Sequence, residues 1–278
     1  GVTKAALAEY YLAIADWMLP HVAGRPLTLF RCPNGRGKPC FYQRHPGEGM
    51  PAGIRTVPVR EKDGTYDSIS IEDVEGLIGL AQIGALEIHT WGSRLDRIEQ
   101  ADRIVFDLDP DEGLPWARVA EAARIMRERL SDLGLESFLK TTGGKGLHVV
   151  APIRRGPDWE EVKAFTKAVV ERMAGDDPAR FTANMSKAKR KGRIYVDFLR
   201  NQRTATFIAP YSTRAKSGAP VSVPIFWEEL DEGVRSDQFN TTTLPRRLRS
   251  LEEDPWAEID RLRQGITAAA MRKVGMRS

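Results

Sequence analysis

The chain has 278 residues, 41% hydrophobic and 29% charged, which predicts a soluble globular protein of one or two domains with an ample core. Lys and Arg exceed Asp and Glu by 42 − 38 = 4, so a polyanionic partner is indicated only where the cations cluster. No run of about 18 apolar residues occurs, which excludes a helical membrane span.

The two cysteines, Cys32 and Cys40, do not belong to a CxxC pair, which argues against a zinc site. A disulfide between them stays open, but a chain of this size and composition favours reduced thiols in the cytosol. The chain begins Gly-Val-Thr-Lys without an initiator Met or a signal-peptide pattern, so we expect a fragment of a longer polypeptide.

A helix is predicted over residues 4–19, because apolar residues recur at helical spacing from Leu7 to Met18 and Pro20 follows as a stop. Residues 47–70 are rich in Pro and Gly and then alternate, which indicates a loop with short strands.

Residues 27–33 and 40–45 read as two strands around a basic, Gly-rich turn, which predicts a hairpin. The second strand carries Phe41 and Tyr42 close to Arg31 and other cations. Aromatic rings can stack on bases while cations hold phosphates, so this hairpin is a candidate nucleic-acid surface. The alternative is that one ring is core and the other is surface.

Residues 71–84 read as an amphipathic helix and residues 85–91 as a strand that carries His89. A histidine in such a strand is more often structural than catalytic, so His89 alone predicts little.

An apolar strand over residues 103–110 ends in two acids and a proline. Because side chains alternate along a strand, Asp107 and Asp109 share one face. Two adjacent acids repel unless a cation lies between them, and a hard divalent ion with oxygen ligands is the usual solution. Pro110 closes the strand, which puts the acids at the carboxyl end, where α/β sheets bind ligands. The alternative is a pair of solvated acids.

Residues 115–133 and 158–174 read as amphipathic helices. Between them, a strand over 136–140 leads into a turn with three glycines around Lys145, and His148 follows. Glycines let the backbone approach an anion, although the turn lacks the Walker A pattern and an ordinary hairpin remains possible.

Five cations lie between Lys187 and Arg193, and the run leads into a strand over 194–200 that carries Asp197 among apolar residues. A carboxylate in that setting is costly unless it is paired or ligated. A strand over 204–210 and a second basic loop over 211–218 follow, and a charged helix is predicted from about Pro255.

These parts fit one mechanism. Asp107, Asp109 and Asp197 on neighbouring strands can hold two hard cations, and the Gly/Lys turn with His148 and downstream basic residues can neutralise a triphosphate. Basic and aromatic surface can hold a nucleic-acid strand. Together they describe two-metal nucleotidyl transfer.

Four motifs now carry a family resemblance: Phe-Asp-Leu-Asp-Pro at 106–110, Gly-Gly-Lys-Gly-Leu-His at 143–148, Val-Asp-Phe at 196–198 and Ile-Ala-Pro-Tyr-Ser at 208–212. In this order they resemble the primase-polymerase domain of bacterial LigD-type multifunctional DNA-repair ligases, in the archaeo-eukaryotic primase superfamily. The resemblance covers nearly the whole chain.

The resemblance implies roles for individual residues. The metal ligands are Asp107, Asp109 and Asp197, for two Mn²⁺ or Mg²⁺ ions. The residues around the incoming NTP or dNTP are His89, Thr142, Lys145, His148, Arg200, Gln202, Arg214 and Lys216. The family more often has Ser at the position of Thr142. The DNA-binding residues are Lys4 on the 5′-phosphate of a gap or end and the template-stacking pair Phe41 and Tyr42. Arg31 is a further DNA-binding candidate because it is a cation beside that pair.

The resemblance also implies templated and untemplated addition of nucleotides to the 3′-OH of broken or gapped DNA in bacterial non-homologous end joining. The implied partners are Ku and the ligase and nuclease domains of the same polypeptide, in the cytoplasm at the nucleoid. The implied fold is α/β (α+β), with a central mixed sheet flanked by helices. An RRM-like catalytic core spans 96–230, between an N-terminal α/β module at 1–95 and a C-terminal helical segment at 231–278.

Two other classes of function compete. Val-Phe-Asp-Leu-Asp mimics the nucleophile strand of haloacid-dehalogenase phosphohydrolases, in which Asp107 would be phosphorylated. That family continues with Gly-Thr near the start of its domain, whereas Pro110 follows here at mid-chain. A non-catalytic nucleic-acid-binding module is the second competitor, and the retained acids argue against it.

Overall fold

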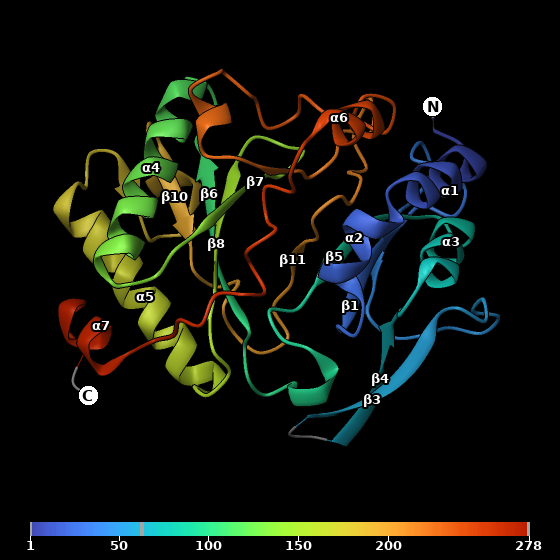
Figure 1. Cartoon of the computed structure of the whole chain (residues 1–278), viewed down its shortest axis with the longest axis horizontal. Helices are drawn as coiled ribbons and strands as arrows, with labels where there is room; N and C mark the ends of the chain where they lie inside the picture. The colour runs from blue at the N-terminus through green and yellow to red at the C-terminus, as the bar shows by residue number, and fades with distance from the viewer. Residues whose placement is uncertain (1, 62–63, 277–278) are drawn as a thin grey trace.

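A computed structural model describes residues 2–61 and 64–276 and contains two six-stranded sheets (Figure 1). The first sheet has the order β11-β5-β1-β4-β3, with β2 also paired to β1, and all its pairings are antiparallel. Its strands are β1 (Leu27–Arg31), β2 (Phe41–Gln43), β3 (Arg55–Glu61), β4 (Gly64–Ser70), β5 (Ala85–Thr90) and β11 (Phe207–Ile208). The predicted hairpin between β1 and β2 is confirmed.

The second sheet has the order β12-β7-β8-β6-β10-β9, and it is mixed because β9 and β10 are parallel while the other pairs are antiparallel. Its strands are β6 (Arg103–Pro110), β7 (Phe138–Thr141), β8 (Leu147–Pro152), β9 (Phe181–Thr182), β10 (Ile194–Asp197) and β12 (Pro224–Ile225). The predicted α/β fold with a mixed sheet is therefore confirmed. The chain also contributes β11, from the stretch predicted as catalytic core, to the first sheet.

Helices flank both sheets. The first sheet is accompanied by α1 (Lys4–Ala13), α2 (Ala15–Val22) and α3 (Val74–Gln82), and the second by α4 (Trp116–Asp132) and α5 (Trp159–Asp176). Figure 1 shows α4 and α5 on the left, α1 and α3 on the right and α2 near the middle. Three short 3₁₀ segments are η1 (Leu95–Arg97), η2 (Lys187–Arg190) and η3 (Glu228–Leu230). None of the helices within the described residues is long and apolar enough to cross a bilayer.

The alternation of β6 decides what lies on each face of the second sheet. Phe106 and Leu108 are fully buried in the main core, whereas Val105 packs with Phe207 of β11 in a separate cluster. Val105 and Asp107 share a face, since they are two residues apart on one strand. The acid face of the second sheet is thus the face that meets the first sheet.

The single helix predicted over 4–19 is wrong, because the chain breaks at Ile14 (φ −121°) and α2 continues to Val22. Pro20 does not stop α2, since it lies in the last turn and removes only one intrahelical hydrogen bond. The strand predicted over 204–210 is reduced to the two residues of β11. Residues 62 and 63, within the stretch expected to hold short strands, lie outside the described residues.

The helix predicted from Pro255 is also wrong. Residues 255–261 form successive turns, because Trp256 packs on Phe138 and Ile259 and its indole donates a hydrogen bond to the Leu139 carbonyl at 2.9 Å. The helices of the C-terminal stretch are instead α6 (Leu244–Ser250) and α7 (Ala268–Lys273).

The expectation that the cysteines are reduced is wrong for this structure, in which Cys32 and Cys40 form a disulfide. Cys32 follows β1 and Cys40 precedes β2, so the pairing of these strands brings the two Cα atoms within 4.4 Å. Sequence separation alone could not reveal this pairing.

Candidate active site

A row of four charged or titratable side chains crosses the second sheet. Lys140 on β7, His148 on β8, Asp107 on β6 and Asp197 on β10 are successive cross-strand partners. Directly opposed residues of antiparallel strands project from the same face. The two acids that the sequence placed on separate strands are therefore immediate neighbours.

Basic side chains surround Asp107. Its Oδ1 lies 3.4 Å from His148 Nε2, and its Oδ2 lies 3.4 Å from Arg200 Nε. Although burial raises the pKa of the Asp107 carboxyl, the contact with His148 and the charges of Arg200 and Lys140 hold that pKa well below its usual value. Burial, aided by the charge of Lys140, lowers the pKa of His148 to about 4, so its ring is neutral near pH 7.

Asp197 shares Arg200 with Asp107, since Arg200 Nε lies 3.2 Å from Asp197 Oδ2. Asp197 Oδ1 accepts hydrogen bonds from the Leu199 backbone N–H at 2.8 Å and from the Tyr195 hydroxyl at 3.1 Å. Burial raises the pKa of Asp197 despite the charge of Arg200. One guanidinium thus bridges two carboxylates that would otherwise repel.

Asp109 lies on the same face as Asp107, opposite Tyr195 of β10, and 3.8 Å from the Arg190 guanidinium of the basic run. Burial, followed by the charge of Asp107, raises the pKa of Asp109 to about 7. This acid therefore sits in an excess of negative charge that a cation would relieve.

Within residues 2–61 and 64–276, no three His, Cys, Asp or Glu side chains already converge as a metal cluster. The residues nevertheless fit hard cations: Asp107 and Asp197 face each other, Asp109 carries a raised pKa, and oxygen is the donor that such ions prefer. Arg200 Nε is buried between the carboxylates but makes no hydrogen bond to the described residues. Its positive charge lies near the carboxylates without using their hydrogen-bonding capacity.

The glycine-rich turn between β7 and β8 lies against the acid strand. A Cβ on Gly146 would lie 2.3 Å from the carbonyl oxygen of Leu108, so only glycine fits there. Gly143 adopts φ +65°, which glycine adopts without strain. Thr142 and Lys145 of this turn line the same cavity as Asp107 and Asp109.

A cavity of about 520 Å³ opens above the acid face, between the two sheets. It is lined by both acids of β6 and by seven residues predicted around a nucleotide: His89, Thr142, Lys145, His148, Arg200, Arg214 and Lys216. Gln202, predicted in the same group, does not line this cavity, and neither does the predicted metal ligand Asp197. Tyr42 and Arg44 of the β2 region form part of its edge.

Both aromatic residues of β2 are exposed, Phe41 by 47% and Tyr42 by 63%, so the alternative in which one of them is core is wrong. Arg31 is half-buried and donates to the Ile83 carbonyl and to Gln43 Oε1, with its guanidinium carbon 5.6 Å from the Phe41 ring centre. Arg31 therefore supports the aromatic pair, and its guanidinium is already hydrogen-bonded within the protein.

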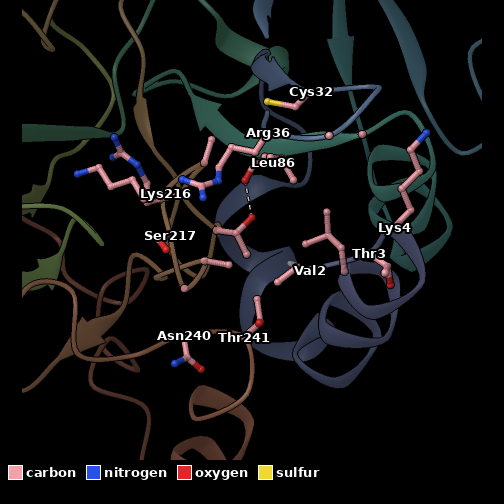
Figure 2. Close-up of a pocket in the computed structure, with 18 of the residues that line it drawn as sticks. Val2, Thr3, Lys4, Cys32, Arg36, Leu86, Lys216, Ser217, Asn240 and Thr241 are labelled. Atoms are coloured by element: carbon pink, nitrogen blue, oxygen red, sulfur yellow. Dashed lines mark hydrogen bonds between the residues drawn. The ribbon is translucent and has the colours of Figure 1, made fainter. Parts of the chain in front are cut away.

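Lys4 lies in a second cavity, of about 780 Å³, on the other side of the loop at 213–219. Figure 2 shows Lys4 and Lys216 on opposite sides of this cavity, with Arg36 between them in that view. Arg214 and Lys216 line both cavities, so the loop that carries them is a shared wall.

Sequence reasoning missed Glu87, which is 5% exposed on β5. Glu87 accepts hydrogen bonds from His89 and from Arg214, two residues of the smaller cavity. The available signal was its spacing of two from His89, which puts both side chains on one face of the predicted strand.

Two packed sheets with facing acids beneath a cationic cavity define a primase-polymerase type of domain. The chain matches the family described as "LigD, primase-polymerase domain" over residues 3–256 and belongs to that family.

Similar proteins point to the same family. The chain is 42% identical to the multifunctional non-homologous end joining protein LigD of Pseudomonas aeruginosa, over 98% of this chain and 33% of that protein. It is 38% identical to the multifunctional non-homologous end joining DNA repair protein LigD of Mycobacterium tuberculosis, over 84% of this chain and 32% of that protein. The chain thus spans about a third of the length of these relatives.

A solved structure, the polymerase domain from Mycobacterium tuberculosis ligase D in complex with DNA, is similar to this one with a TM-score of 0.86 and 34% identity. The similarity covers 94% of this chain and 93% of that chain.

Proposed function

We propose that this chain is a DNA-repair polymerase that adds ribo- or deoxynucleotides to the 3′-OH of broken or gapped DNA in bacterial non-homologous end joining. The observation that carries the proposal is that Asp107, which lines a cation-rich cavity, lies directly opposite Asp197 on the neighbouring strand. A triphosphate needs such cations, and its transfer needs the carboxylates.

Asp107, Asp109 and Asp197 would hold two Mn²⁺ or Mg²⁺ ions. When bound, the ions supply activation of the 3′-hydroxyl and stabilisation of the pyrophosphate leaving group. The chain's own part is to keep Asp107 ionised and next to Asp197, which Arg200 and His148 support by their contacts.

Nucleotide binding is assigned to the cavity wall. Arg214, Lys216 and Lys145 would neutralise the triphosphate, and the neutral ring of His148 would stay close to the reacting phosphate. The Thr142 hydroxyl donates to the Gly146 carbonyl at 3.0 Å and lies 3.2 Å from the Ser236 hydroxyl, so its contacts lie within the protein. The assignment of Gln202 to nucleotide binding rests only on the family resemblance.

DNA is the proposed macromolecular partner. The exposed rings of Phe41 and Tyr42, supported by Arg31, would stack on the template strand. Lys4 would contact the 5′-phosphate of a gap or a double-strand end from the larger cavity. Ku, and the ligase and nuclease domains found in multifunctional relatives, are the proposed protein partners, at the nucleoid in the cytoplasm.

The two alternative functions are not favoured. A phosphohydrolase would use Asp107 as a nucleophile, yet here Asp107 lies between His148 and Asp197 in a shared charge network. A non-catalytic binding module would not need Asp107 and Asp109 lining a cavity with Asp197 directly opposite Asp107.

Primer extension on a gapped duplex tests the proposal, with rNTP or dNTP and with Mn²⁺ or Mg²⁺. We expect metal-dependent incorporation opposite the gap. No incorporation with either ion, together with binding of beryllofluoride to Asp107 as a mimic of a phospho-aspartate, would replace the polymerase with the phosphohydrolase.

A further inference from the structure

The buried carboxylate of Glu87 contacts groups from two distant parts of the chain. Its Oε2 accepts a hydrogen bond from His89 Nε2 at 2.9 Å, and its Oε1 accepts from Arg214 Nε at 3.2 Å. Oε1 also accepts from the backbone N–H of Ala215 at 3.0 Å. One acid thus joins β5 to the loop at 213–219, the shared wall of the two cavities.

This acid is not needed merely to attach the loop to β5. Thr213 donates its hydroxyl hydrogen to the Leu86 carbonyl, and the Ile88 backbone N–H donates to Ser212 Oγ at 2.8 Å. Both contacts hold the loop without Glu87. The additional effect of the Glu87 side chain is therefore to orient the side chains of His89 and Arg214.

Arg214 is held at several points. Its Nε donates to Glu87 and its Nη1 donates to the Thr142 carbonyl at 3.2 Å. A Cβ on Gly143 would lie 2.8 Å from the Arg214 Cγ, so the aliphatic stem lies closely against this glycine. Nη2 makes no hydrogen bond to the residues that the structure describes, which leaves it available to a ligand.

His89 is constrained in the same way. Burial lowers the pKa of His89, so the ring is neutral, and the bond to Glu87 assigns the proton to Nε2. Nδ1 is then the acceptor. Although burial raises the pKa of Glu87, the hydrogen bond from His89 and the charge of Arg214 bring that pKa below its usual value. The Glu87 carboxylate therefore stays ionised.

Resting on the proposed function, we propose that Glu87 is a positioning residue for the incoming nucleotide. Its carboxylate fixes the guanidinium of Arg214 and the ring of His89 in the orientations that receive the nucleotide. Preorganised donors bind a triphosphate more tightly than mobile ones, because their ordering is complete before the ligand arrives.

A double-mutant cycle with Glu87→Ala and Arg214→Ala tests this role, with nucleotide KM and kcat measured on a gapped duplex. We expect Glu87→Ala to raise KM roughly tenfold, the effect of one lost charge-assisted contact, with kcat changed less than about threefold. In the Arg214→Ala background the same change should have a much smaller effect on KM. Glu128→Ala, an exposed acid on α4, is the matched control and should leave both constants unchanged.

Glu87→Gln keeps the shape of the side chain and carries the test if Glu87→Ala does not fold; a smaller rise in KM is expected. An unchanged KM, or KM effects that add in the double variant, would overturn the positioning role while Arg214→Ala still raises KM. If Arg214→Ala itself leaves KM unchanged, the assignment of the nucleotide to this cavity fails as well.

Discussion

Asp107 and Asp197 lie directly opposite each other on antiparallel strands, with the Arg200 guanidinium 3.4 Å and 3.2 Å from their respective Oδ2 atoms. The sheet register, rather than a loop, sets this spacing. Rigid strands hold carboxylates more reproducibly than loops do, which suits the proposed role of these acids as metal ligands.

Replacing Asp107 or Asp197 should abolish catalysis without abolishing DNA binding. We expect Asp107→Ala or Asp197→Ala to reduce incorporation by more than about 100-fold, because several kcal/mol of charge stabilisation are lost. DNA binding should stay within a few-fold, since both acids are buried whereas the aromatic pair is exposed. Primer extension and fluorescence anisotropy measure the two effects.

Asp132→Ala, an exposed acid at the end of α4, is the control and should be neutral. Parallel loss of binding and activity in the Asp107 and Asp197 variants would mean that these acids are structural.

Lys4→Ala should weaken binding selectively to gaps that carry a 5′-phosphate. Lys4 is exposed and lines the larger cavity, so the loss of one charge contact should raise Kd by about fivefold. Competition between phosphorylated and unphosphorylated gapped duplexes measures the selectivity. Lys167→Ala on α5 is a matched control, and equal effects of Lys4→Ala on both duplexes would refute the assignment.

The ion pair between Arg25 and Asp102 should make the stability of the fold depend on pH. Arg25 is fully buried and donates to both carboxylate oxygens of Asp102, at 2.8 Å and 2.6 Å. Although burial raises the pKa of Asp102, the charges of Arg25 and Arg103 bring it well below its usual value. The pair therefore stabilises the folded state above the unfolded pKa of about 4, and this contribution is lost as pH falls through the lower, folded pKa.

Urea unfolding tests this dependence. Asp102→Asn should lower the free energy of unfolding by about 3 kcal/mol near pH 7, because it leaves a buried cation without its partner. The difference from the wild type should shrink as the pH is lowered below about 4. A difference that does not change with pH would show that the carboxylate charge is not responsible.

Reduction of the disulfide between Cys32 and Cys40 should lower stability. Closing a loop of this length lowers the conformational entropy of the unfolded chain, which raises the free energy of unfolding by about 2 kcal/mol. We therefore expect dithiothreitol to lower the free energy of unfolding of the wild type by that amount. The double variant Cys32→Ser, Cys40→Ser should be less stable and insensitive to dithiothreitol; a wild type that is also insensitive would contradict the pairing.

The sequence by itself determined the local elements and the kind of chemistry. Alternation and Pro110 defined β6 with its two acids, and amphipathic spacing defined α4 and α5. The glycines around Lys145 predicted a close approach of the backbone, which Gly146 makes to the Leu108 carbonyl. These features depend on a few neighbouring residues, so they can be read without knowing the rest of the fold.

The tertiary structure alone decided which distant residues meet. The pairing of Asp107 with Asp197, the contacts of Glu87 with Arg214 and the turns around Trp256 all depend on strand register and on packing between segments far apart in the chain. The same holds for β11, which joins the first sheet from a stretch assigned to the core. Periodicity specifies which face a residue occupies, but the residue that lies opposite is selected by long-range packing.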